Sequence, residues 1–239
     1  MNYLMADIHG DYDSFLTMLK KIQFNKDKDF LVVIGDALDR NDKPLEVLSL
    51  IRQYESTGSA LMIKGNHELF AQMYLEGRLE GSTWDYWGGV ATRKQIDSLS
   101  KEEQTELLEY IKNLPLYSYM NSPFYGDMIL THTGIDHNCV MMTPDGMVDI
   151  ARSIESGYER DDFHFLVGSD LHFLTEESLE LLDHYIICGH VCTFNINEDR
   201  SSNAYVTPYY MDIDCGCGHR DRGGKLCCYC VDTNEFYYV

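Results

Sequence analysis

This sequence of 239 residues lacks both long apolar runs and a secretory signal. No stretch of about 18 consecutive apolar residues occurs, so the sequence predicts no membrane-spanning helix. The first ten residues, MNYLMADIHG, show no basic region followed by the apolar core that a secretory signal needs. We therefore expect a cytoplasmic protein with no membrane partner.

Basic residues are also scarce. Lysine and arginine total 19 against 39 aspartate and glutamate residues, which gives a formal net charge of −20. Proteins that bind nucleic acid or anionic membranes through charge need clustered lysine and arginine. The composition therefore argues against nucleic acid as a partner. An acidic shell around a cationic pocket is still compatible with a phosphorylated substrate, because bound divalent ions would reverse the local charge.

Disulfide bonds are not expected, because a chain without a secretion signal stays in a reducing compartment. Five of the eight cysteines nevertheless lie near the carboxyl end: Cys215, Cys217, Cys227, Cys228 and Cys230. They could bind zinc, or they could be small buried residues on two strands. Structural zinc sites favour two or more residues between paired cysteines, and these pairs are closer than that. The spacing therefore favours buried strand residues.

Linkers, internal repeats and low-complexity segments are absent too, so we expect a single domain over residues 1–239. The first part alternates strands that end near residues 6, 34 and 63 with helices at 13–22, 44–54 and after 66. This alternation predicts a mostly parallel sheet, whose ligands gather beyond the carboxyl ends of its strands.

The second part changes pattern. A helix is expected at 84–96 and another after the capping box at Ser100, with short helices at 147–155 and 176–182. Strands are expected at 115–120, 125–131, 184–188, 205–213, 225–231 and 235–239, and the last three are expected to pair antiparallel. The predicted fold class is α/β, with two mixed sheets packed as a sandwich and flanked by helices.

Polar residues follow the apolar strands at the points where the strands end. They are Asp7, His9, Asp36, Asp39, Arg40, Asn66, His67, His132 and His190. Histidine, aspartate and asparagine together form a mixed nitrogen and oxygen ligand set, which suits Mn, Fe or Zn better than Ca or Mg. Taken singly, each has a plainer explanation: His132 and His190 as core histidines, or His67 as the start of a helix. The joint pattern favours a metal centre.

The motifs DIHG, GDALDR, GNHE, THTG and a final GH resemble those of the metallophosphoesterase superfamily, and in particular its phosphoprotein phosphatase branch. The resemblance implies a calcineurin-like fold and two divalent transition-metal ions, with Mn²⁺ expected and Fe or Zn as alternatives. It implies that Asp7 and His9 bind the first ion and that Asp36 bridges both. Asn66, His132 and His190 would complete the second site.

The resemblance also implies catalytic roles. His67 would be the general acid and Asp39 would orient it. Arg40 would bind the phosphate together with Asn66, and Arg160 would be the second phosphate-binding arginine. The chain departs from the family pattern at Asn41 and Thr133, where glycine is usual, and neither departure removes a ligand.

The expected activity is hydrolysis of phosphoserine and phosphothreonine in proteins by direct attack of a metal-bridging hydroxide. The alternative is hydrolysis of dinucleoside polyphosphates or other small phosphoesters, for which residues 83–93 (with Trp84, Tyr86, Trp87 and Arg93) could hold a base. A catalytically silent phosphoprotein-binding module is the contrasting hypothesis, and the complete set of motifs argues against it. The substrate, a phosphorylated protein or small phosphoester, is the expected partner, and the sequence predicts no oligomeric state.

Overall fold

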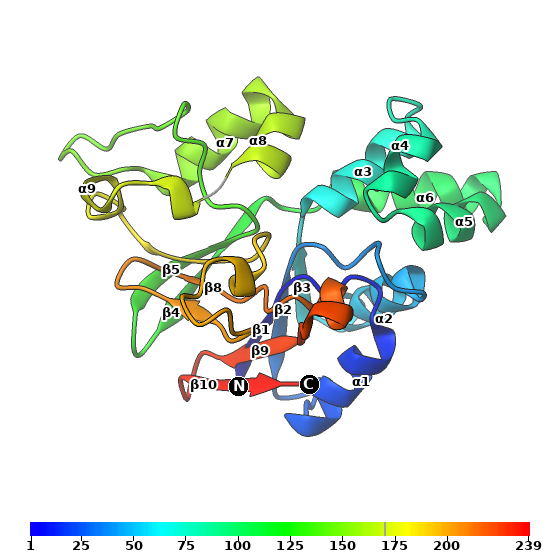
Figure 1. The fold of residues 1–239 in the computed structure, drawn as a ribbon, viewed down its shortest axis with the longest axis horizontal. Coiled ribbons are helices and arrows are strands. Elements are labelled where there is room, and N and C mark those ends of the chain that lie inside the picture. The colour runs from blue at the N-terminus through cyan, green and yellow to red at the C-terminus, as the bar shows by residue number, and fades with distance from the viewer. Residues whose placement is uncertain (170) are drawn as a thin grey trace.

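Two mixed β-sheets lie between layers of helices in the computed structural model, which describes residues 1–169 and 171–239 (Figure 1). Each sheet has five strands, in the orders β10-β9-β1-β2-β3 and β4-β5-β6-β8-β7. The strands are β1 (Asn2–Met5), β2 (Phe30–Ile34), β3 (Ala60–Ile63), β4 (Tyr117–Ser122), β5 (Gly126–Thr131), β6 (Tyr185–Cys188), β7 (Tyr205–Val206), β8 (Tyr210–Asp212), β9 (Cys227–Cys230) and β10 (Glu235–Tyr238). The expected fold class is confirmed.

Helices cover the outer faces of both sheets. They are α1 (Tyr12–Lys21), α2 (Pro44–Ser56), α3 (Asn66–Leu75), α4 (Gly81–Tyr86), α5 (Val90–Ser98), α6 (Lys101–Lys112), α7 (Ile150–Arg160), α8 (Asp162–Gly168) and α9 (Glu176–Leu179), with the 3₁₀ turns η1 (Leu171–Phe173), η2 (Thr193–Asn195) and η3 (Cys217–Arg222). Among the described residues, no helix combines the length and apolar character needed to cross a bilayer.

The first sheet is buried on both faces, because successive side chains of a strand point to opposite sides. In β1, Leu4 packs into the layer between the sheets, while Tyr3 and Met5 pack under the outer helices. β1, β2 and β3 pair in parallel, and β9 and β10 add antiparallel strands beside β1. Both termini therefore lie on this sheet (Figure 1).

The second sheet faces the first through a shared apolar layer. Val32 and Ile34 of the first sheet belong to the same buried cluster as Leu130, Ile187 and Met211 of the second. β5, β6 and β8 pair in parallel, so their carboxyl ends meet at one edge. That edge lies beside the carboxyl ends of β1, β2 and β3.

The structure corrects several sequence predictions. The segment 205–213 is two short antiparallel strands, because Pro208 cannot donate an N–H inside a strand and a turn forms there. The predicted antiparallel run of three strands is wrong, since β8 belongs to the second sheet while β9 and β10 pair in the first. The expected helix at 84–96 is split into α4 and α5 at Gly88, whose φ is 104°.

The helix expected at 147–155 begins later, at Ile150, because Asp149 caps it by accepting a hydrogen bond from the Arg152 amide at 3.0 Å. The capping box at Ser100 and Glu103 is confirmed. All eight cysteines are free thiols. Cys227, Cys228 and Cys230 are buried on β9 as predicted, whereas Cys215 and Cys217 are buried in the loop after β8 and at the start of η3, not on a strand.

Candidate metal centre

The strand ends of both sheets meet at one buried site. The loop after β1 carries Asp7 and His9, and the loop after β2 carries Asp36. Backbone hydrogen bonds fasten these two loops together, with the Asp7 amide donating to the Gly35 carbonyl at 3.2 Å and the His9 amide to the Asp36 carbonyl at 2.9 Å. The first turn of α3, after β3, lies at the same place.

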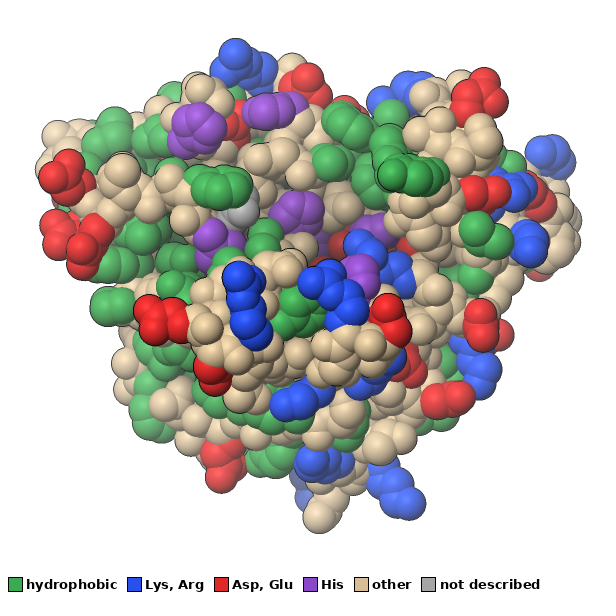
Figure 2. Space-filling model, viewed as in Figure 1, with side chains coloured by type: hydrophobic (Ala, Val, Ile, Leu, Met, Phe, Trp, Pro, Cys, Tyr) green, Lys and Arg blue, Asp and Glu red, His purple; other side chains and the backbone are tan. Residues whose placement is uncertain are grey.

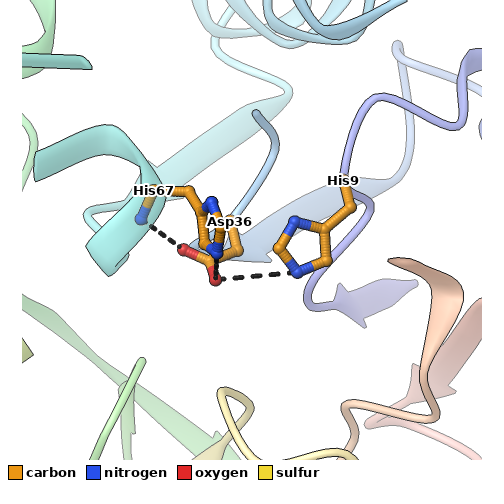
Figure 3. Close-up of side chains that lie close together, drawn as sticks. All are labelled: His9, Asp36 and His67. Carbon is orange, nitrogen blue, oxygen red and sulfur yellow. Dashed lines mark hydrogen bonds and ion pairs between the residues drawn. The ribbon is translucent and has the colours of Figure 1, made fainter. Parts of the chain in front are cut away.

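Two groups of potential ligand atoms share Asp36. One group comprises His9, Asp36 and His67, and its ligand atoms all lie within 4.8 Å of one another (Figure 3). The other comprises Asp7, Asp36 and His132 within the same limit. All five residues are buried, with exposed fractions between 0% and 3%. Because Asp36 belongs to both groups, it could supply a ligand to each of two ions.

Asn66 and His190 complete the second group. The side-chain oxygen of Asn66 lies 2.9 Å from His132 Nε2 and 3.0 Å from His190 Nδ1. The structure therefore brings together all six residues that the sequence analysis proposed as ligands. Their individual roles remain predictions.

Backbone carbonyls fix which nitrogen of two histidines faces the site. His9 Nδ1 hydrogen bonds the Leu38 carbonyl at 2.9 Å, and His132 Nδ1 hydrogen bonds the Ile34 carbonyl at 3.0 Å. Each ring thus turns Nε2 toward Asp36, as metal-binding histidines do when a second partner sets their tautomer. Mixed imidazole, carboxylate and amide donors fit two divalent transition-metal ions.

The charges in the site act strongly on one another. Burial tends to raise the pKa of Asp36, but His132 and His67 outweigh it and hold that pKa well below its usual range. Burial opposes protonation of His132, yet Asp36 raises its pKa to about 9. Burial and the neighbouring His132 lower the pKa of His190 to about 3. Bound divalent cations would favour neutral imidazoles and ionised carboxylates throughout.

Backbone strain marks the same loops. Positive φ angles outside glycine occur at Asp7 (54°), His9 (50°), Asp36 (54°), Asp39 (69°), Arg40 (67°) and His190 (77°). Such conformations cost free energy, and they persist where surrounding structure enforces them, which is often at functional sites. Most of the strained non-glycine residues of the described chain are thus the predicted site residues.

His67 and Asp39 form the predicted acid pair. His67 Nδ1 lies 2.6 Å from Asp39 Oδ2, and Trp84 Nε1 donates to the same oxygen at 2.7 Å. Burial opposes protonation of His67, but Asp36 and Asp39 outweigh it and raise its pKa. The Nε2 atom faces Asp36, 3.8 Å from its Oδ2 (Figure 3). A protonated His67 is therefore held by Asp39 with its other nitrogen toward the site.

The structure changes the interpretation of residues 83–93. Trp84 is fully buried against Asp39, so it cannot stack on a substrate base. Arg93 forms ion pairs with Asp85 at 2.7 Å and with Asp97 at 3.1 Å. The base-holding role proposed for this segment is wrong for Trp84, and it stays a prediction for Tyr86, Trp87 and Arg93.

Arg40 lies at the mouth of the site. Its Nε donates to His9 Nε2 at 3.2 Å, and its Nη2 lies 3.5 Å from His67 Nε2. Arg160, in contrast, is at the end of α7, where its Nη1 donates to the Asn138 carbonyl and the Cys139 sulfur, both at 3.4 Å. The structure thus joins Arg40 to the site residues, whereas the phosphate-binding role of Arg160 stays a prediction.

Glu68 is a site residue that the sequence analysis missed. Its buried carboxylate accepts hydrogen bonds from the backbone amides of Asp36 (2.8 Å), Ala37 (3.0 Å), Leu38 (3.3 Å) and Gly65 (3.0 Å). Burial raises the pKa of Glu68 to about 7, and the backbone donors oppose this rise. Glu68 follows His67 directly, and the sequence suggested only a favourable charge at a helix start.

A second missed group lies in the segment that follows β8. Asp214 is buried, and burial together with Asp214 and Asp36 raises the pKa of Asp7. His219, on η3, lies with its Nε2 2.9 Å from Arg40 Nη1. The acidic pair in MDID was visible in the sequence, but nothing there placed His219 beside Arg40.

The fold and the two groups of potential metal ligands are those of a calcineurin-like phosphoesterase. Residues 3–194 match the calcineurin-like phosphoesterase family, and the chain belongs to that family. It is similar to the symmetrical bis(5′-nucleosyl)-tetraphosphatase of Histophilus somni, with 28% identity over 171 residues, covering 70% of this chain and 55% of the relative. It is also similar to the enzyme of that description from Aliivibrio fischeri, with 30% identity covering 64% of this chain and 51% of the relative.

The chain spans about half the length of these relatives. Among solved structures, it resembles a protein serine/threonine phosphatase from Saccharomyces cerevisiae, with a TM-score of 0.65. That likeness has 15% sequence identity and covers 95% of this chain and 71% of the other, so it supports the shared fold alone.

Proposed function

We propose that this phosphoesterase hydrolyses dinucleoside polyphosphates at a centre of two divalent metal ions. The observation that supports the chemistry is the position of Asp36, which belongs to two buried ligand groups next to Arg40. The substrate class rests on the relatives at 28% and 30% identity, both named as symmetrical tetraphosphatases. This was the alternative in the sequence analysis, and the relatives favour it over phosphoprotein.

The side chains of the site have separate tasks. Two divalent ions held around Asp36 would lower the pKa of a water molecule and neutralise charge on the phosphoryl oxygens. Arg40 offers a planar fork of N–H donors, which suits bidentate binding of phosphate. His67 can donate a proton from Nε2 to the leaving oxygen, while Asp39 holds the ring. We expect Mn²⁺, with Fe or Zn as alternatives, because of the mixed donor set.

Phosphoserine and phosphothreonine in proteins are the second candidate substrates. The buried pair of His67 and Asp39 favours them, because a seryl or threonyl oxygen leaves as a strongly basic alkoxide that needs a proton. A nucleoside diphosphate is a better leaving group, since the second pKa of a phosphate is only about 6. It therefore gains less from a general acid.

A substrate panel tests the proposal. The purified protein, loaded in turn with Mn²⁺, Fe²⁺ and Zn²⁺, is given diadenosine tetraphosphate, a phosphoserine peptide and nitrophenyl phosphate, with Asp36→Asn as the blank for contaminating phosphatases. We expect the highest kcat/KM for the dinucleotide, and two molecules of nucleoside diphosphate as its products. A phosphopeptide that is preferred by about tenfold, or 1.4 kcal/mol, would establish the second candidate instead.

A further inference from the structure

The segment that carries His219 packs directly against the metal centre. A Cβ atom on Gly218 would collide with Arg40 Cδ and would lie 2.7 Å from His9 Cδ2. Only a residue without a side chain fits there, so the backbone of η3 comes as close to the site as it can. The next residue, His219, thereby reaches Arg40, which donates from Nη1 to His219 Nε2 at 2.9 Å.

Two more basic side chains continue from His219 along the edge of the site. The Arg222 guanidinium lies over the ring of Phe194, 4.4 Å from its centroid, and its Nη2 donates to Asn195 Oδ1 at 3.5 Å. Arg200 Nη1 donates to the carbonyl of the same Asn195 at 3.0 Å. Phe194 and Asn195 belong to η2, which begins three residues after His190. We call Arg40, His219, Arg222 and Arg200 the basic lip.

The basic lip is held in place but is not neutralised by carboxylates. Among the residues that the structure describes, no carboxylate forms an ion pair with Arg40, Arg200 or Arg222. Arg220, which lies between them in sequence, points elsewhere and pairs with Asp11 at 2.8 Å. Burial, together with Arg40 and Arg222, lowers the pKa of the His219 imidazole against the effect of Asp221. His219 therefore belongs to the basic lip as a neutral ring that accepts from Arg40, and the arginines supply its positive charge.

Positive side chains gather at this edge although the molecule is acidic overall. The chain has a formal net charge of −20, yet Lys and Arg side chains gather beside the histidines in the central hollow (Figure 2). Positive groups at the mouth of a site attract and orient anionic ligands. Arg40 alone would serve one phosphoryl group at the metals, so the other three side chains extend the anion-binding surface beyond it.

We propose that the basic lip is a subsite for the phosphates that follow the reacting phosphoryl group in a polyphosphate chain. The reacting group would lie at Arg40 and the ligands, and the next phosphates would lie along His219 and Arg222, with Arg200 at the outer end. The subsite would select substrates with several consecutive phosphates over simple monoesters. This inference rests on the proposed function, because it names the part of the substrate that the lip binds.

Inhibition measurements test the subsite without depending on dinucleotide cleavage. Hydrolysis of nitrophenyl phosphate is inhibited with orthophosphate and, separately, with a methylene-bridged tripolyphosphate that cannot be hydrolysed, at constant free Mn²⁺. The quantity compared is the ratio of the two inhibition constants, tripolyphosphate over orthophosphate. Arg222→Gln should raise this ratio about tenfold through loss of a charge-assisted contact, and Arg222→Glu should raise it further.

Arg152→Gln is the matched control, because Arg152 is 56% exposed and pairs with Asp149 on α7, away from the lip. Its ratio should equal that of the unaltered protein. The subsite proposal would be overturned if Arg222→Gln and Arg222→Glu showed the same ratio as the control. It would also be overturned if both inhibitors bound these variants more weakly by the same factor. If the ratio rises but diadenosine tetraphosphate is not cleaved, the subsite stands and the proposed function fails. If diadenosine tetraphosphate is cleaved but the ratio of inhibition constants is unchanged, the proposed function stands and the subsite fails.

Discussion

The two sheets contribute to the metal centre in different ways. The first sheet supplies whole loops: Asp7 and His9 follow β1, Asp36 follows β2, and Asn66 follows β3. The second sheet supplies single histidines, His132 after β5 and His190 after β6. The loops of the first sheet form hydrogen bonds with one another, whereas His132 of the second sheet is oriented by a hydrogen bond to the first.

Hydrogen bonds show this dependence. The Gly10 amide donates to the Ala37 carbonyl at 2.8 Å, which joins two loops within the first sheet. His132, from the second sheet, is oriented by the Ile34 carbonyl of the first at 3.0 Å. The first sheet therefore builds the frame of the site, and the second sheet closes it. Damage to the frame should cost more than damage elsewhere.

The largest effect is expected at Asp36, where the frame meets both ligand groups. Asp36→Asn removes the charge that both ions would share, and two-metal stabilisation is worth several kcal/mol, so kcat/KM should fall on the order of a thousandfold. Steady-state kinetics with nitrophenyl phosphate measures the loss. A fall of less than about tenfold would show that Asp36 is not shared.

Glu68→Gln should be the next most damaging change, since it removes a buried carboxylate from four backbone N–H donors. We expect the free energy of unfolding to fall by about 3 kcal/mol, because hydrogen bonds to charged groups are the stronger ones. Urea denaturation measures it. Glu103→Gln is the matched control: Glu103 holds the equivalent position in the exposed capping box of α6 and should matter far less. If the two variants lowered the free energy of unfolding equally, the Glu68 carboxylate would not stabilise the site loops more than an exposed capping residue does.

His67→Asn separates substrates by their leaving groups. Removal of the proton donor should lower kcat/KM for a phosphoserine peptide about a hundredfold more than for nitrophenyl phosphate, whose leaving group needs no proton. Diadenosine tetraphosphate should resemble nitrophenyl phosphate. Parallel assays of the three substrates give the comparison. Equal losses on all three would place His67 among the metal ligands and not at the leaving oxygen.

The smallest effect is expected at Cys228, which is buried on β9 opposite Met5 of β1 and belongs to neither group of potential ligands. Cys228→Ala should lower the free energy of unfolding by about 1 kcal/mol, roughly the value of one buried methylene group. Metal content and kcat/KM should not change. Loss of a tightly bound zinc ion from this variant would contradict the purely structural role of the cysteine.

The sequence predicted the first sheet better than the second. β2 and β3 are continuous apolar runs that end in turn residues, and their observed bounds agree with the predicted ones. The second sheet contains the two shortest strands, β7 and β8, because Pro208 divides a run that looked continuous. Local pattern therefore sufficed for strands whose ends are marked in the sequence and failed where a turn lay inside an apolar run.

The candidate site shows the same limit. Its six predicted ligands followed apolar strands, so the sequence could mark them. The contacts of Glu68, Trp84 and His219 join segments that are far apart in the chain, and no local pattern reports them. Trp84 was considered for holding a substrate base, yet it is buried and donates to Asp39. The residues that hold the ligands in place are thus harder to predict from the sequence than the ligands themselves.

The central claim is that Asp36 lies between two metal ions. Calorimetric titration of the metal-free protein with Mn²⁺, followed by elemental analysis of the loaded protein, tests it most directly. We expect about two ions per chain, with phosphoesterase activity that is lost on chelation and restored by Mn²⁺. Binding of a single ion with full activity, or activity that survives complete removal of metal, would contradict it.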